Sequence, residues 1–198
     1  MPASPSGILE LPVPRLAPGL SLEQALAKRR STREFRAEPV PLAQVSALLW
    51  AAFGINRAGN WGRTAPSAHN RQAVTVYVVL PEGAYRYEPG EHRLQRVHDG
   101  DLRALTGTQE FAATAPLNLV YVVDFGHEEE VDEEEHGFLA GADVGCIAEN
   151  VYLYCAATGL ATVVRGLIDR RPLAQALGLR RSQRIALAQS IGYPRVPD

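Results

Sequence analysis

Three polar residues at alternate positions provide the first candidate for ligand binding. Arg29, Ser31 and Arg33 would all point the same way from an extended backbone, and a helix would still align the two arginines. Two guanidinium groups and a hydroxyl suit a phosphate, because charge-assisted, bidentate hydrogen bonds are among the strongest that side chains make. The competing interpretation is a basic last turn that complements the dipole of the preceding helix.

A second polar cluster joins a glycine-bearing loop to a predicted strand. Serine, histidine, asparagine and glutamine lie close together within the segment 66–72. Asn70 and Gln72 each offer a donor and an acceptor, which suits the amide edge of a heterocycle such as the pyrimidine ring of a flavin. The alternative is a turn held by hydrogen bonds between side chains and backbone.

A predicted strand that breaks at a glycine provides the third candidate. The run 163–169 reads VVRGLID, and the backbone loses its sheet partner where Gly166 interrupts it. Backbone N–H groups that are freed from a sheet next to a glycine can approach a ligand atom closely.

The composition removes several kinds of chemistry. Lys28 is the only lysine, so a Schiff base would have to form there, and the P-loop, HExxH, CxxC, GxSxG and GxGxxG patterns are absent. A formal net charge of −2 offers no strongly basic face, so we expect no nucleic-acid partner. The acidic run 127–136 has a histidine at each end, but no second ligand cluster accompanies it. We therefore interpret it as a solvated loop or a fraying helix start and expect no metal site.

The elements that position these clusters follow from hydrophobic periodicity. Five prolines make residues 1–20 an irregular arm, and Ser21 is expected to cap a helix that runs into Arg29. Further helices are expected at 42–53, 138–158 and 171–177, short helical pieces at 101–105 and 109–113, a loop at 56–66, and strands at 74–80, 84–88, 92–98, 117–124, 161–164 and 184–191. This order predicts an α+β fold with a mixed, mostly antiparallel central sheet flanked by helices.

The long helix at 138–158 carries a stripe of small residues, including Gly141 and Gly145, which would let another helix or a second subunit approach. Cys146 and Cys155 are about 13 Å apart on this helix and cannot pair. We expect both to be buried thiols in a reducing compartment, and a cytoplasmic location. No run of 18 apolar residues or signal peptide is visible, so we expect no membrane partner.

In this order, the features resemble the nitroreductase family of FMN-dependent oxidoreductases. The resemblance covers the chain from Ser21 to Pro194. Within the family, the chain is most similar to the branch with thiazoline and oxazoline oxidase-like members. The matching segments are SLEQALAKRRSTREF, PLAQVSALLWAAFGINR, RTAPSAHNRQ, GADVGCIAENVYLYCAATGLATVV and IGYP.

The resemblance implies a single FMN-binding domain over 21–198 and a homodimer whose interface, formed around the long helix, holds two FMN molecules. Arg29, Arg30 and Ser31 would hold the phosphate and ribityl chain, and Arg33 would reach the N1 and C2 carbonyl edge. Ser67 and Asn70 would contact the ring from the partner subunit. The backbone of Arg165 and Gly166 would lie near N5 and O4. The full predicted set is Arg29, Arg30, Ser31, Arg33, Pro66, Ser67, Ala68, Asn70, Gln72, Val164, Arg165 and Gly166.

Two departures from the family pattern affect this expectation. Ala73 and Val74 follow the N-x-Q triplet, where many members have proline and an aromatic residue. Arg195 is the only basic residue after the IGYP motif, so phosphate contacts are expected mostly from residues 29–33.

The expected activity is ping-pong hydride transfer from NADH or NADPH through FMN to a quinone, nitroaromatic or similar small acceptor. The flavin carries this chemistry, so no catalytic side chain is expected. The alternative is a flavin-dependent dehydrogenase or reductive dehalogenase that acts on a dedicated substrate without nicotinamide. A third hypothesis is a non-enzymatic interaction module, which would be colourless and would not bind FMN.

Overall fold

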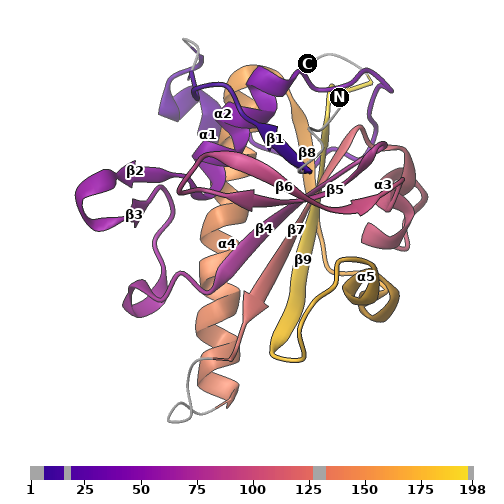
Figure 1. The fold of residues 1–198 in the computed structure, drawn as a ribbon. Coiled ribbons are helices and arrows are strands. Elements are labelled where there is room, and N and C mark those ends of the chain that lie inside the picture. Colours follow the sequence, from indigo (N-terminus) through magenta and orange to yellow (C-terminus); the bar gives the residue numbers. More distant parts are fainter. Residues whose placement is uncertain (1–6, 16–18, 127–132, 196–198) are drawn as a thin grey trace.

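The computed structural model describes residues 7–15, 19–126 and 133–195, and a seven-stranded sheet runs through its centre (Figure 1). The strands lie in the order β1-β6-β5-β4-β7-β9-β8, and every neighbouring pair is antiparallel. Their bounds are β1 Ile8–Glu10, β4 Val74–Leu80, β5 Gly83–Glu88, β6 Arg93–Asp99, β7 Leu117–Asp124, β8 Ala161–Arg165 and β9 Gln183–Gly192. The predicted α+β class with an antiparallel sheet is confirmed.

The helices occur where periodicity predicted them. Ser21 caps the first in a capping box, because its hydroxyl accepts from the Gln24 N–H at 3.3 Å and the Gln24 amide oxygen accepts from the Ser21 N–H at 3.0 Å. The bounds are α1 Leu22–Lys28, α2 Leu42–Phe53, α3 Glu110–Thr114, α4 Glu133–Thr158 and α5 Arg170–Ala176, with short 3-10 turns η1 Ala58–Asn60, η2 Ala68–Asn70 and η3 Arg103–Thr106.

Two apolar cores lie on opposite faces of the sheet. Val78 of β4 belongs to the core formed with Leu48 of α2 and Ile147 of α4, whereas the next residue, Val79, belongs to the core that contains Leu173 of α5. Helix α4 runs along one face (Figure 1). A sheet covered on both faces explains why its central strands read as continuous apolar runs rather than as alternating patterns.

Short extended segments were missed by the sequence analysis. Residues 8–10 lie in the arm that was expected to be irregular, but they form β1, which pairs with Arg93–Gln95 of β6. The loop expected at 56–66 contains a two-stranded sheet of β2 Ile55–Arg57 and β3 Gly62–Arg63, which projects beside α2 (Figure 1). A pattern of two or three residues is too short to show periodicity.

One face of α4 is exposed and lined by small residues. A methyl group built onto Gly141 or Gly145 would meet nothing within 4 Å, so packing within the described chain does not require glycine at either position. Cys146 lies on the same face and is exposed, so its predicted burial is wrong, whereas Cys155 is buried as expected. The exposed residues of this face are Gly137, Phe138, Gly141, Ala142, Gly145, Cys146 and Glu149.

Part of the acidic run lies outside the described residues, namely 127–132. Within the described part, His136 is buried against the Phe125 ring, with the ring centroids 4.8 Å apart. The described ranges contain no group of three or more His, Cys, Asp or Glu residues placed to hold a metal ion. None of the helices in those ranges combines the length and apolar character needed to cross a bilayer.

A buried hydrogen-bond chain anchors the segment that follows β1. The Ser46 hydroxyl contacts the Pro12 carbonyl at 2.5 Å and His92 Nε2 at 2.7 Å, and the Tyr87 hydroxyl contacts His92 Nδ1 at 2.9 Å. Because the carbonyl only accepts, Ser46 uses its single proton there and must accept from His92 Nε2–H. With a neutral imidazole, Tyr87 donates to Nδ1, whereas with an imidazolium it would have to accept from it.

The stability of the protein is expected to fall in mild acid through His92. Burial lowers the pKa of this histidine below its ordinary value of 6.5, so the unfolded chain takes up a proton at a higher pH than the folded chain does. Its contribution to stability is complete above that value and is lost as the pH falls through and below it. Urea unfolding at several pH values would measure this, and His92→Gln should flatten the profile. An unchanged profile in that variant would contradict the assignment.

Candidate functional site

Tyr152 of α4 brings the first and third sequence clusters together. Its hydroxyl lies 2.8 Å from the Ser31 hydroxyl and accepts from the Val164 N–H at 2.9 Å. The Arg29 guanidinium lies over its ring, 5.3 Å from the centroid. Because α1 ends at Lys28 and the chain then continues without helix, Arg29 and Ser31 share one side, as predicted for an extended backbone. Tyr152 is buried, and it was not among the site residues predicted from the sequence.

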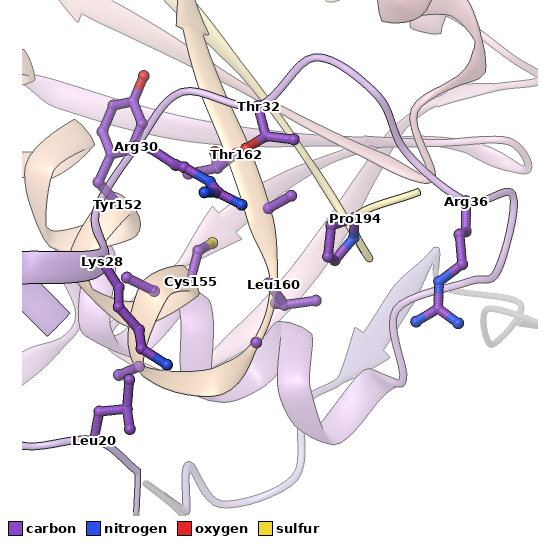
Figure 2. Close-up of a pocket in the computed structure, with 14 residues that line it drawn as sticks. Leu20, Lys28, Arg30, Thr32, Arg36, Tyr152, Cys155, Leu160, Thr162 and Pro194 are labelled. Atoms are coloured by element: carbon purple, nitrogen blue, oxygen red, sulfur yellow. The ribbon is translucent and has the colours of Figure 1, made fainter. Parts of the chain in front are cut away.

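The other side of this segment lines a cavity of about 380 Å³. Lys28, Arg30 and Thr32 alternate with the residues that face Tyr152, and Arg36 lies at the far end of the cavity (Figure 2). No acidic residue lies among the described lining residues. The Thr32 N–H donates to the Thr162 carbonyl at 3.0 Å, which fixes the segment against β8. Arg30 therefore lies apart from Arg29 and Ser31, in a cavity with three cationic side chains.

The remaining wall of this cavity is mainly apolar and neutral. Cys155 and Leu160 contribute to it, together with the small residues near the end of α4 (Figure 2). Complete burial raises the pKa of the Cys155 thiol, so this group stays protonated and adds no negative charge. Arg36 is partly engaged elsewhere, because it pairs with Glu38 at 3.4 Å and lies over the Tyr193 ring. The net field in the cavity favours an anion.

β8 is the edge strand of the sheet, and its outer edge faces the same region. The Thr162 carbonyl and the Val164 N–H both point outward, to Thr32 and Tyr152, so the backbone groups of Val163 between them face β9. This alternation directs the N–H of Gly166 outward and that of Arg165 toward β9. The structure therefore favours Gly166 over Arg165 as the backbone donor at the end of this edge. Arg33, the last residue of the first cluster, is exposed.

The second cluster forms a turn held by its own side chains. The Ser67 hydroxyl accepts from the Gln72 N–H at 2.8 Å, and the Asp143 carboxylate accepts from the Ala68 N–H at 2.9 Å. Asn70 has φ 55° and Gln72 has φ 52°, which are left-handed conformations that asparagine tolerates better than most residues. Pro66 and Asn70 are exposed. Within the described chain, the segment therefore forms a turn with side chain to backbone bonds from Ser67 and Asp143.

Gln72 holds this turn rather than presenting a free amide. Its side-chain oxygen accepts from Arg63 Nε at 2.8 Å, and its amide nitrogen donates to the Trp61 carbonyl and to Asn70 Oδ1, both at 3.0 Å. Both amide protons are therefore used within the chain. These bonds connect the β2–β3 hairpin to the turn and fix the position of Asn70.

The two parts of the predicted site lie on different sides of α4. Asp143, which holds the second cluster, and Tyr152, which holds the first, are nine residues apart on the helix. Nine residues correspond to about two and a half turns and about 13 Å of rise, so the two side chains leave the helix in opposite directions. One chain therefore unites the first and third clusters, and it does not bring the second cluster to them.

Comparison with known proteins shows the family of this chain. The model of the nitroreductase family matches residues 26–193. A nitroreductase-like protein of Methanocaldococcus jannaschii is 32% identical over 157 residues, which cover 74% of this chain and 79% of that protein.

Solved structures show the same similarity. The crystal structure of a nitroreductase-like protein from Ralstonia eutropha has a TM-score of 0.91 and 43% identity, and the match covers 98% of this chain and 93% of that chain. The NADPH:FMN oxidoreductase of Vibrio harveyi, solved with NAD⁺, shares the fold with a TM-score of 0.66 at 20% identity, over 89% of this chain and 70% of that chain. The matched family model, the identity to these relatives and the shared fold lead to one conclusion: this chain belongs to the nitroreductase family.

Proposed function

We propose that this oxidoreductase binds FMN and transfers hydride by a ping-pong mechanism from NADH or NADPH to a quinone, a nitroaromatic or a similar small acceptor. Family membership establishes the general class of oxidoreductase. The cofactor, the nicotinamide and the acceptor are proposals. The Vibrio harveyi relative, whose name includes NADPH and FMN, supports the first two.

The observation that carries the proposal is the cationic cavity beside the outer edge of β8. Lys28, Arg30 and Arg36 give it three positive side chains, and Thr32 adds a hydroxyl. This donor set fits a phosphate monoester, because a doubly charged phosphate offers several strong acceptor oxygens. The Gly166 N–H at the end of β8 fits the polar edge of a ring. The residues present are therefore suited to a phosphorylated heterocycle.

Each group would have a separate task with FMN bound, when the flavin supplies the atom that accepts and returns the hydride. The cavity would hold the phosphate, and Ser31, positioned by Tyr152, would hold the ribityl chain. Arg29 and Arg33 would place positive charge near the N1 and C2 carbonyl edge, where negative charge increases on reduction. The Gly166 N–H would donate to the opposite edge of the ring. No side chain here is required to transfer a proton.

A homodimer is part of the proposal. The exposed face of α4 offers glycines that permit close helix approach, and the second cluster lies on the other side of that helix from Tyr152. A second copy packed on this face would bring its own Ser67 and Asn70 to the site that the first copy leaves incomplete.

A charged, bulky residue on this face of α4 is expected to separate the subunits. In Gly145→Arg, the new side chain would occupy the space through which the partner helix approaches, so we expect at least a tenfold weaker dimer, about 1.4 kcal/mol. Sedimentation velocity at micromolar concentration would measure it. Gln175→Arg, an exposed substitution on α5, is the control. A wild-type monomer, or a variant that dimerises as well as the wild type, would contradict the proposed interface.

Anaerobic reduction tests the proposed activity. The protein should be purified, reconstituted with FMN and mixed with NADH or NADPH without oxygen. The flavin absorbance near roughly 450 nm should bleach and return when a quinone is added. A protein that binds FMN but keeps its absorbance with either nicotinamide would favour the alternative, a dedicated substrate without nicotinamide. A protein that binds no FMN would overturn the proposal and favour an interaction module.

A further inference from the structure

The Arg165 side chain is a buried cation that has no carboxylate partner among the described residues. It is 4% exposed and points to the face of the sheet away from α4. Nη1 donates to the Thr106 carbonyl at 2.6 Å, and Nη2 donates to Asn118 Oδ1 at 2.8 Å and to the Thr106 hydroxyl at 3.2 Å. Nε is buried and has no hydrogen-bond partner. All of these acceptors are neutral.

Burying an arginine among neutral acceptors lowers the stability of the folded state. A buried charge without an opposite charge loses most of its hydration, and neutral hydrogen bonds recover only part of that free energy. Burial accordingly lowers the Arg165 pKa to about 10, and no nearby charge opposes the shift. The guanidinium still carries its proton at neutral pH. An apolar or amide side chain could fill this position at lower cost, so the charge itself points to a function.

The position of Arg165 indicates what that function is. It is the last residue of β8 and directly precedes Gly166, whose N–H is expected to point away from β9 because backbone directions alternate along the strand. The guanidinium therefore belongs to the residue directly before the backbone amide that would contact the ring. Screening by solvent is weak for a charge that is this deeply buried. Thr106 and Asn118 come from η3 and β7, so the same bonds fix the end of β8 against two other elements.

We infer that Arg165 is a positioning residue whose unpaired, buried guanidinium fixes the end of β8 and places a permanent positive charge behind the ring-binding amide, making the bound flavin easier to reduce. This inference rests on the proposed function. In the reaction concerned, the C–H bond of the nicotinamide breaks and both electrons leave with the proton as hydride. The nicotinamide becomes oxidised, and the ring gains one negative charge. A nearby fixed cation favours the state that carries this charge.

The test is the midpoint potential of the bound FMN, measured by spectroelectrochemical titration. Asn118→Asp keeps the arginine but sets a carboxylate against it, and the arginine should hold that carboxylate ionised. Asn118→Thr makes a neutral change at the same place. Arg165→Gln removes the charge, and Arg170→Gln removes an exposed arginine on the same side of the sheet, which bonds the Ile185 and Ala186 carbonyls.

We expect Asn118→Asp and Arg165→Gln to shift the equilibrium toward oxidised flavin by roughly tenfold, which is about 30 mV for a two-electron couple. Asn118→Thr and Arg170→Gln should stay near the wild-type potential. If Arg165→Gln does not fold, the two Asn118 variants decide the question. Equal potentials in those two variants would overturn the inference while leaving the proposed function intact. Wild-type protein that binds no FMN would overturn both.

Discussion

Gly107→Ala is expected to lower the free energy of unfolding by about 2–5 kcal/mol, although it adds a single methyl group. Gly107 has φ −177°, an extended conformation that any residue adopts, so the cost is steric. The new methyl would overlap Arg165 Nη1 and come within 3.2 Å of Ala112 Cβ. An exposed arginine would move aside at little cost. This one is buried and bonded to Thr106, so the methyl must break a buried charged hydrogen bond or displace the surrounding core.

Chemical denaturation would measure this effect, with Gly59→Ala as the control. A methyl group at Gly59 meets nothing within 4 Å, so that variant should stay within about 0.5 kcal/mol of wild type. A double-mutant cycle with Arg165→Met isolates the cause, because the shorter, uncharged side chain vacates the contested space. Gly107→Ala should cost less in that background. An equal cost in both backgrounds would show that the clash with Arg165 is not responsible.

Arg30→Glu is expected to weaken FMN binding by at least about a hundredfold, or 2.7 kcal/mol. The substitution replaces one of three cations in the cavity with an anion, so the phosphate loses an attractive partner and gains a repulsive one. Quenching of FMN fluorescence would give the dissociation constant. Riboflavin has the same ring and ribityl chain but no phosphate. Its affinity should therefore change by less than about tenfold, which separates loss of the phosphate contact from general damage.

Arg171→Glu is the matched control, because it makes the same charge reversal at an exposed position on α5. Long-range electrostatics alone would weaken FMN binding similarly in both variants, and 0.15 M salt would suppress the effect in both. Equal losses of FMN and riboflavin affinity in Arg30→Glu would place the phosphate elsewhere than in this cavity.

Much of the fold could be predicted because its main elements carry strong local signals. The central strands are β-branched and apolar, and α1 begins at a serine that caps it. The elements that the sequence did not predict have weak local patterns, or patterns that favour irregular chain. β1 lies between prolines, and its pairing with β6 depends on residues more than eighty positions away. The β2–β3 hairpin is held largely by Arg63 and Trp61 contacts to Gln72, which no short-range pattern reveals.

The site was only partly predictable for a related reason. Alternation along residues 29–33 predicted that Arg29, Ser31 and Arg33 share one face. The structure agrees for Arg29 and Ser31, which both contact Tyr152, whereas Arg33 is exposed. Arg30, which the resemblance grouped with Arg29 and Ser31, lies instead with Lys28 and Thr32 in a cavity that β8 and the end of α4 close. Tyr152 gave no separate signal, since a tyrosine in an apolar stripe usually serves packing. The roles of its hydroxyl and of the Arg165 side chain depend on tertiary contacts.

The place of β9 within the sheet has a consequence for how the chain is made. Among the described strands, β8 pairs with β9 alone, and β9 lies between β7 and β8 although it follows both in the sequence. During synthesis, β8 has no neighbouring strand to pair with until residues 183–192 emerge. Until then, the segment 29–33 has no paired strand to lie against. Nascent chains should therefore acquire ligand affinity abruptly and late, and translation arrested before β9 should yield protein that binds no cofactor and relies on chaperones.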